Sequence, residues 1–348
     1  MNNKSLIQGA DTKRNRRILL MLAAAFLVLA AGSLFMGRYP VSVSDYIIYL
    51  RALISGNEGW LSSTTASVIS QIRMPRIMAA LIVGGALAIS GGSYQGVFRN
   101  PMVSPDILGA SAGAGFGAAV GILLSLPALG IQLLSFCFGL AAVSMSYLIS
   151  RAVGRRDNIT LVLVLAGMVI SALFSAFVSI TKYLADPYSK LPEITFWLMG
   201  SLSSVVSGDL AFVLPPVIIS GAVLMLLRWR LNVLVFGDEE ASALGMDTKK
   251  YRVVIIVCST LLTASVVSVS GQIGWVGLVI PHFSRMIVGP NYRDLLPASF
   301  LVGGSYLLLV DNVARNLLQV EIPLGILTAV IGAPVFIWLL LKGKRGWS

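Results

Sequence analysis

The residues best suited to chemistry are gathered in one short stretch, FGDEEASALGMDTKKYR, from Phe236 to Arg252. It holds four acidic and three basic side chains, in a chain of which only 12% of residues are charged. Asp238 is predicted to cap a short helix, because a side-chain oxygen at the N-cap accepts hydrogen bonds from the free amides of the first turn. Glu239 and Glu240 would then face the positive end of the helix dipole, and Gly245 suits the position just after the helix. A helix of about two turns does not persist unaided, so the stretch is either an ordinary solvated loop or a surface that docks on a partner.

The sequence contains no pattern that predicts an enzyme. The phosphate-binding pattern GxxxxGK[ST], the zinc motif HExxH and a mid-span carboxylate suited to ion coupling are all missing. Cys137 and Cys258 lie in separate apolar runs and are expected to be buried free thiols. His282, the only histidine, is expected to serve structure. We therefore expect no catalytic residue, no metal and no cofactor, and an energy source outside this chain.

Hydrophobicity places these residues in a membrane protein. Of the 348 residues 56% are hydrophobic, and apolar runs of about 20 residues, long enough to cross a bilayer core, recur along the chain. The first run could be a signal peptide, but its length and the poor cleavage site after it favour a retained span. The sequence therefore predicts an all-α, polytopic membrane protein with about ten transmembrane helices, at about 17–37, 74–94, 105–126, 131–150, 158–181, 208–227, 253–270, 275–289, 296–314 and 323–341.

The positive charges set the orientation of these spans. With a cytoplasmic N-terminus, 19 of the 26 Lys and Arg residues fall on the cytoplasmic side, where such residues are retained. We therefore expect both termini to be cytoplasmic, in the plasma (inner) membrane of a bacterium. The expected organisation is a basic tail (1–16), one transmembrane domain (17–342) whose polar loop covers about 228–252, and a short tail (343–348). The net charge of +11 comes without basic patches interleaved with aromatic residues, so nucleic acid is not an expected partner.

Small residues recur at helical spacing in two of the predicted spans. Gly84, Ala88 and Gly92 form one stripe, and a second consists of Gly109, Gly113, Gly117 and Gly121. Such stripes let helix backbones approach closely. We expect tight packing within a bundle at both stripes, which is typical of a transporter or a channel.

Four long segments resemble the FecCD-type permeases, the membrane subunits of ABC importers for iron–siderophores, haem and vitamin B12. The first is QIRMPRIMAALIVGGALAISGGSYQGVFRNPMVSPDILGASAGAGFG, from Gln71 to Gly117. GDEEASALGM, GQIGWVGLVIPHFSRMIVGPNYRDLLP and VDNVAR…EIPLGILTAVIGAPVFIWLLLK follow in the family's order. The resemblance runs from about Arg38 to Lys342. Its departures are mild, with Met74 in place of a common Leu and Val103-Ser104 in place of a common Ala-Asp.

The resemblance implies a fold, partners and site residues. The fold would be a bundle like that of the vitamin B12 importer permease, in a homodimer with the translocation path between the subunits. Two cytoplasmic ABC ATPase subunits and an extracytoplasmic solute-binding protein would be partners, with membrane lipid around the bundle. The positions implied for ATPase coupling are Gly237, Asp238, Glu239, Glu240, Ala241, Ser242, Ala243, Leu244 and Gly245.

Further positions carry over from the same family. Arg73, Arg76 and Arg315, at outer span ends, would receive acidic residues of the binding protein. Snorkelling or interfacial anchoring is their ordinary alternative. Asn100 and Pro101 would support a turn or gate on the inner side. The expected cargo is an iron(III)–siderophore, with haem, cobalamin or molybdate as alternatives in the same class and an ion-driven secondary transporter as the rival class.

Overall fold

The computed structural model describes residues 3–55, 62–154 and 159–343, and no β-strand occurs in these ranges. Ten helices match the ten predicted spans in order. They are α1 (Asn3–Phe35), α4 (Met74–Val97), α5 (Ala110–Leu123), α6 (Ala128–Val153), α7 (Ile159–Leu184), α9 (Ser207–Phe236), α11 (Thr248–Ser270), α12 (Val276–Val288), α13 (Tyr292–Asn316) and α14 (Leu324–Gly343). The shorter elements are α2 (Val43–Ser55), α3 (Ser63–Ser67), the π-helical turn η2 (Val68–Arg73), the 3-10 turn η3 (Pro105–Leu108), α8 (Lys190–Leu198) and α10 (Asp238–Ala243).

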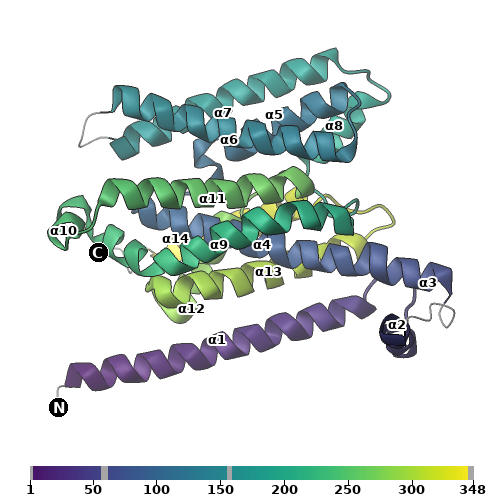
Figure 1. Cartoon of the computed structure of the whole chain (residues 1–348), viewed down its shortest axis with the longest axis horizontal. Helices are drawn as coiled ribbons and strands as arrows, with labels where there is room; N and C mark the ends of the chain where they lie inside the picture. Colours follow the sequence, from purple (N-terminus) through teal and green to yellow (C-terminus); the bar gives the residue numbers. More distant parts are fainter. Residues whose placement is uncertain (1–2, 56–61, 155–158, 344–348) are drawn as a thin grey trace.

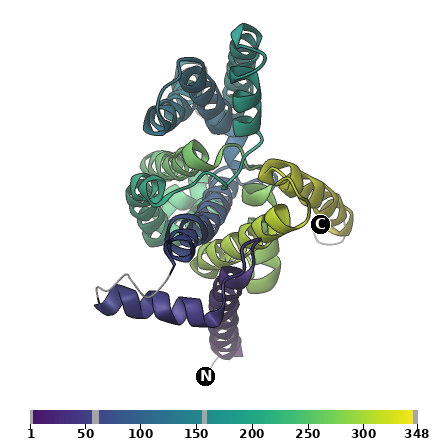
Figure 2. The same cartoon turned by 90° about the vertical axis from the view of Figure 1, so that its right-hand side faces the viewer.

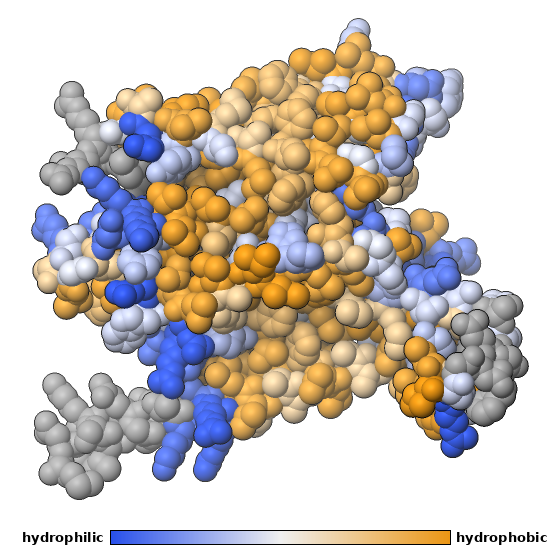
Figure 3. All heavy atoms as spheres, in the orientation of Figure 1, coloured by the Kyte–Doolittle hydropathy of each residue, from blue (hydrophilic) through white to orange (hydrophobic). Residues whose placement is uncertain are grey.

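The surface of the bundle has the banding of a membrane protein. Figure 3 shows an apolar belt that separates polar surfaces at the two ends. Within the described residues, seven helices are long and apolar enough to cross a bilayer, and α5, α12 and α14 contribute shorter apolar stretches. Figure 1 shows the N and C labels at the end that carries α10, as the predicted topology requires. We call this the cytoplasmic end and the opposite one the outer end.

Helix α4 forms the centre of the bundle. It packs against α9, α11, α12 and α13, and 83% of its most apolar window is buried, against 6% for α1. A Cβ added at Gly84 would stand 2.3 Å from the carbonyl oxygen of Gly303, so α4 and α13 cross at a distance that only glycine allows. The predicted packing role of the first small-residue stripe is confirmed here.

A second group of helices, α5, α6 and α7, lies beside α11 (Figure 1). A Cβ at Gly117 would stand 2.3 Å from the carbonyl oxygen of Leu134, which confirms close packing at the second stripe. α5 has 14 residues and so a length of about 21 Å. It begins inside the protein, after η3 and the left-handed Gly109 (φ 88°). Irregular backbone at this depth is tolerated because protein surrounds it.

Helix α1 lies at the edge of the bundle along α13, and α2 projects beyond it (Figure 2). α1 is tied to its neighbours near both ends. Asn15 Nδ2 donates hydrogen bonds to Val288 O and to Asp294 Oδ2, each at 2.9 Å. Ser33 Oγ donates to Asn312 Oδ1 at 2.8 Å. The two polar contacts hold an otherwise lipid-facing helix against the bundle.

The structure adds detail that the sequence did not predict. α1 already begins at Asn3, so the expected N-terminal tail is largely helical. The helices at the outer end (α2, α3 and α8) were also missed, because they are too short for a span. Cys258 is buried as expected, but Cys137 is exposed on α6, which corrects the prediction of two buried thiols. A thiol in an apolar run can face outward when the run faces lipid or another subunit.

Candidate functional site: the cytoplasmic helix and the outer arginines

The charged stretch forms the predicted short helix, α10, but its cap differs. Gly237 is the N-cap, with a φ of 128°, and Asp238 is the first helical residue. Asp238 was therefore wrongly predicted as the cap, because a glycine supplied the backbone turn instead. Glu239 and Glu240 do lie in the first turn, where their negative charges interact favourably with the positive end of the helix dipole.

The end of α10 matches the prediction for Gly245. This residue has a φ of 76° and its amide donates to Ser242 O at 2.9 Å, while Met246 N donates to Ala241 O at 3.1 Å. These two bonds form a Schellman motif, which needs a left-handed residue after the C-cap. The short helix is thus closed by its own backbone.

Two kinds of contact anchor α10 to the bundle. Ala241 is fully buried and Met246 is 4% exposed. Asp238 Oδ1 accepts a hydrogen bond from Arg252 Nη2 of α11 at 2.6 Å, in an ion pair. Beside the helix a cavity of about 1510 Å³ is lined by basic residues as well as by the acids of α10. These basic residues are Arg99, Arg151, Lys249, Lys250 and Arg252.

The side of α10 that faces away from the buried Ala241 is open. Glu239, Glu240 and Ala243 are exposed, and Leu244 and Phe236 are 71% and 72% exposed. Large apolar side chains beside acids, at the polar end of a membrane protein, are typical of a protein-binding surface. We call Phe236, Glu239, Glu240, Ala243 and Leu244 the coupling face.

Asn100 and Pro101 lie in the turn that follows α4 at the cytoplasmic end. Asn100 Oδ1 accepts from Met102 N at 2.9 Å, and Val103 N donates to Asn100 O at 3.3 Å. Arg99 precedes them with a φ of 50°, a backbone conformation that costs free energy in a non-glycine residue. Asn100 therefore holds a tight turn, and a role in gating stays a prediction.

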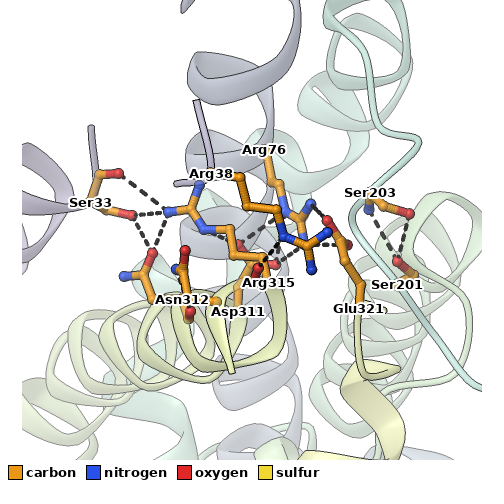
Figure 4. Close-up of polar contacts among 10 residues, drawn as sticks. Ser33, Arg38, Arg76, Ser201, Ser203, Asp311, Asn312, Arg315 and Glu321 are labelled. Atoms are coloured by element: carbon orange, nitrogen blue, oxygen red, sulfur yellow. Dashed lines mark hydrogen bonds and ion pairs between the residues drawn. The ribbon is translucent and has the colours of Figure 1, made fainter. Parts of the chain in front are cut away.

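The three outer arginines lie inside the protein, and two of them, Arg76 and Arg315, converge on Asp311 (Figure 4). Arg73, Arg76 and Arg315 are 2%, 6% and 6% exposed. Arg76 reaches two acids. Its Nε and Nη2 bond Asp311 at 2.9–3.1 Å, and its Nη1 and Nη2 bond the two oxygens of Glu321, each at 2.9 Å. Both contacts use the bidentate geometry that suits guanidinium and carboxylate.

Arg315 and Arg73 are also held by neighbouring groups at the outer end. Arg315 Nη2 donates to Ser33 Oγ at 2.8 Å and also to Asn312 Oδ1, and Arg315 Nε lies 3.7 Å from Asp311 Oδ2. Arg73 donates to the carbonyl oxygens of Leu34 and Tyr39. We call Arg76, Asp311, Arg315 and Glu321, which are connected by ion pairs, the arginine network.

This geometry revises the expected setting of the arginines. Their guanidinium groups do not stand free at the surface in this conformation, so docking of a binding protein on them stays a prediction. The sequence analysis missed Asp311 and Glu321. A signal for Asp311 existed, since Asp311 and Arg315 are one helical turn apart.

Comparisons with known proteins agree with this architecture. The model of the FecCD transport family matches residues 22–342. A molybdate import system permease protein of Haemophilus influenzae is 44% identical, over 95% of this chain and 97% of its own. An iron chelatin transport system permease protein of Helicobacter pylori is 38% identical, over 93% and 98%. A hemin transport system permease protein of Yersinia pestis is 36% identical, over 95% and 97%.

A solved structure is similar over almost the whole fold. It is an inward-facing conformation of a metal-chelate type ABC transporter, with a TM-score of 0.84 and 42% identity. The alignment covers 94% of this chain and 99% of the solved chain. The family model matches most of the chain, the relatives match over their full length, and the fold is shared. The chain therefore belongs to the FecCD transport family and is the permease subunit of an ABC importer, a subunit that has no ATPase site of its own.

Proposed function

We propose that this chain and a second copy of it form the translocation path of an ABC importer, and that the coupling face docks on a cytoplasmic ATPase subunit. The observation that carries the docking proposal is the form of α10. Its inner side is fixed by Ala241, Met246 and the Asp238–Arg252 pair, whereas Leu244 and Phe236 are exposed. A short helix held on one side and open on the other can transmit a push from a partner to the helices behind it.

At the outer end we propose that a solute-binding protein docks above the arginine network. The burial of Arg73, Arg76 and Arg315 supports an indirect role for them. By joining α4 to α13 and to the segment that carries Glu321, the network fixes the shape of the outer surface. Direct pairing with acids of the binding protein would require these contacts to open.

For the cargo we propose an iron(III)–siderophore. Iron chelatin and hemin appear in the names of relatives, and the similar solved structure is of the metal-chelate type. Molybdate is the second candidate, favoured by the 44% identical relative from Haemophilus influenzae. Reconstitution with an ATPase subunit and a solute-binding protein, followed by ATP-dependent uptake of radioactive iron chelates or molybdate, separates the two. Uptake of molybdate without uptake of any iron chelate would contradict the leading proposal.

The coupling proposal is tested by a change of one backbone amide in α10. Ser242→Pro removes an interior N–H, whose helical acceptor is Asp238 O, and places the proline ring against that turn. We expect loss of ATP-dependent uptake, with the bundle still folded. Ser242→Ala is the matched control, because it keeps the amide and should transport at the wild-type rate. Normal uptake by Ser242→Pro with its ATPase bound would refute coupling through α10.

A further inference from the structure

A groove of about 810 Å³ opens on the side of the bundle between α5, α7 and α14. The segment 272–275, between α11 and α12, lines it together with Leu198 and Met199 at the end of α8. Its depth follows from the contacts of η3. Pro105 lies against Gly277, and Gly277 lies against Leu87 O in the middle of α4. The groove therefore lies within the apolar belt, far from both polar ends.

Asp106 is the one ionisable side chain among the described residues that line this groove. η3 places it there, directly before α5, and the residue as a whole is partly exposed. Ser111 Oγ donates a hydrogen bond to Asp106 Oδ1, and the nearby start of α5 favours a negative charge. A carboxylate at membrane depth is costly unless it faces water or a partner, so such a residue is a candidate for function.

The other polar groups of the groove are neutral. Ser171 and Ser175 of α7 contribute hydroxyl groups. Gln272 Nε2 donates to Ser111 O at 2.9 Å, which leaves the amide oxygen of Gln272 as a further acceptor. Since no Lys or Arg is among the described lining residues, nothing in the groove compensates the charge of Asp106.

We propose that Asp106 makes this groove selective by charge, so that it admits cationic and hydrogen-bond-donating cargo and disfavours small oxyanions. The inference rests on the proposed function, because it takes the groove as part of the translocation path. A unit charge at about 10 Å and an effective dielectric constant of about 20 changes the local concentration of a monovalent ion about tenfold. Of the two cargo candidates, it favours a neutral or cationic iron chelate over molybdate.

The test measures the electrostatic bias of the groove with thiol reagents of opposite charge. The background replaces the native thiols (Cys137→Ser, Cys258→Ala), and Ser175→Cys, an exposed position of α7, reports from the groove. The permease, assembled with its ATPase in nanodiscs, is treated with the trimethylammonioethyl or the sulfonatoethyl methanethiosulfonate. The observable is the ratio of the two modification rates, divided by the ratio for a free thiol in solution. Ser171→Cys is a second reporter, should Ser175→Cys impair folding.

With Asp106 present, we expect the ratio to favour the cationic reagent by about tenfold or more. Asp106→Asn keeps the shape and the Ser111 contact and should abolish the bias, whereas Asp45→Asn, a partly exposed acid on α2 outside the groove, should preserve it. An unchanged ratio in Asp106→Asn would overturn the proposal, and so would reporters that react with neither reagent. Neither result touches the coupling of α10 to an ATPase, which the Ser242→Pro measurement decides separately.

Discussion

At the outer end of the bundle the arginines of α4 and α13 are enclosed by acids and carbonyls, whereas at the cytoplasmic end the acids of α10 face outward. Both regions are proposed to lie next to partner proteins, and both carry charges at helix ends. Arg76 is 6% exposed and bonds two carboxylates. Glu239 and Glu240 are exposed, and Asp238 is the one acid of α10 that forms an ion pair with a described residue. Charge at the end of a span therefore marks either an internal tie or an interface.

The difference arises from charge balance within the fold. Asp311 and Glu321 compensate Arg76 and Arg315, so the network can be enclosed without an unpaired charge. Of the three acids of α10, Asp238 is paired with Arg252, whereas the exposed Glu239 and Glu240 form no ion pair with a described residue. They remain hydrated or available to another protein. The predictions below test whether the outer end acts as an internal tie and the cytoplasmic end as an interface.

The largest effect is expected for Arg76→Met. It leaves the fully buried Asp311 without its bidentate partner, and removal of one member of a buried pair costs about 3–5 kcal/mol. Unfolding in mixed micelles of detergent and denaturing surfactant measures this loss. Arg38→Met, an exposed arginine at the same end, is the control and should cost far less. Equal losses in the two variants would show that the network is no internal tie.

Glu321→Gln should have a smaller effect, about 1 kcal/mol, since the Glu321 side chain is 36% exposed and Arg76 keeps Asp311. The same unfolding measurement applies. A loss as large as that of Arg76→Met would mean that the two acids share the charge of Arg76 equally.

At the cytoplasmic end, Asp238→Asn should lower stability by about 1 kcal/mol or less, because the carboxylate is 45% exposed and its pair with Arg252 is partly hydrated. The control is Asp247→Asn. The carboxylate of Asp247 caps α11 by accepting a hydrogen bond from Lys250 N, and it forms no ion pair with a described residue. Raising the salt concentration should reduce the gap in the free energy of unfolding between the wild type and Asp238→Asn, because salt screens the ion pair. A gap that does not depend on salt would argue against an electrostatic anchor.

Leu244→Asp should change the free energy of unfolding by about 0.5 kcal/mol or less, as surface substitutions do. The apolar contact with the ATPase should nevertheless be lost, so that copurification of the ATPase fails. Leu53→Asp, another exposed leucine but on α2 at the outer end, should retain the ATPase. Retention of the ATPase by Leu244→Asp would remove Leu244 from the docking surface.

Much of the fold could be predicted because apolar length is a local property. All ten predicted spans contain a helix, and the packing of Gly84 and Gly117 followed from small-residue spacing alone. The start of α1 could not be predicted in the same way. Its first turns are polar and contain no apolar run or clear helical repeat of apolar residues that would indicate a helix. α5 also begins later than expected, because Pro105 and Gly109 divide the predicted span into a 3-10 turn and a helix.

The site was less accessible to sequence reasoning. The limits of α10 depend on nearby residues, so Gly245 was placed correctly, although Gly237 and not Asp238 forms the cap. The partners of Arg76 lie 235 and 245 residues away in sequence, and no local pattern joins them. Asp106 was missed because its meaning depends on the groove that distant helices form around it.

The two ties of α1 have a mechanical consequence. Asn15 bonds Asp294, near the start of α13, and Ser33 bonds Asn312, near its end. A rod pinned to another rod at two distant points can neither slide along it nor pivot away from it. α1 and α13 therefore move as one strut, and because α13 meets α4 at the Gly84–Gly303 crossing, that strut extends into the centre of the bundle. Any displacement that opens a passage must then leave α1 and α13 together.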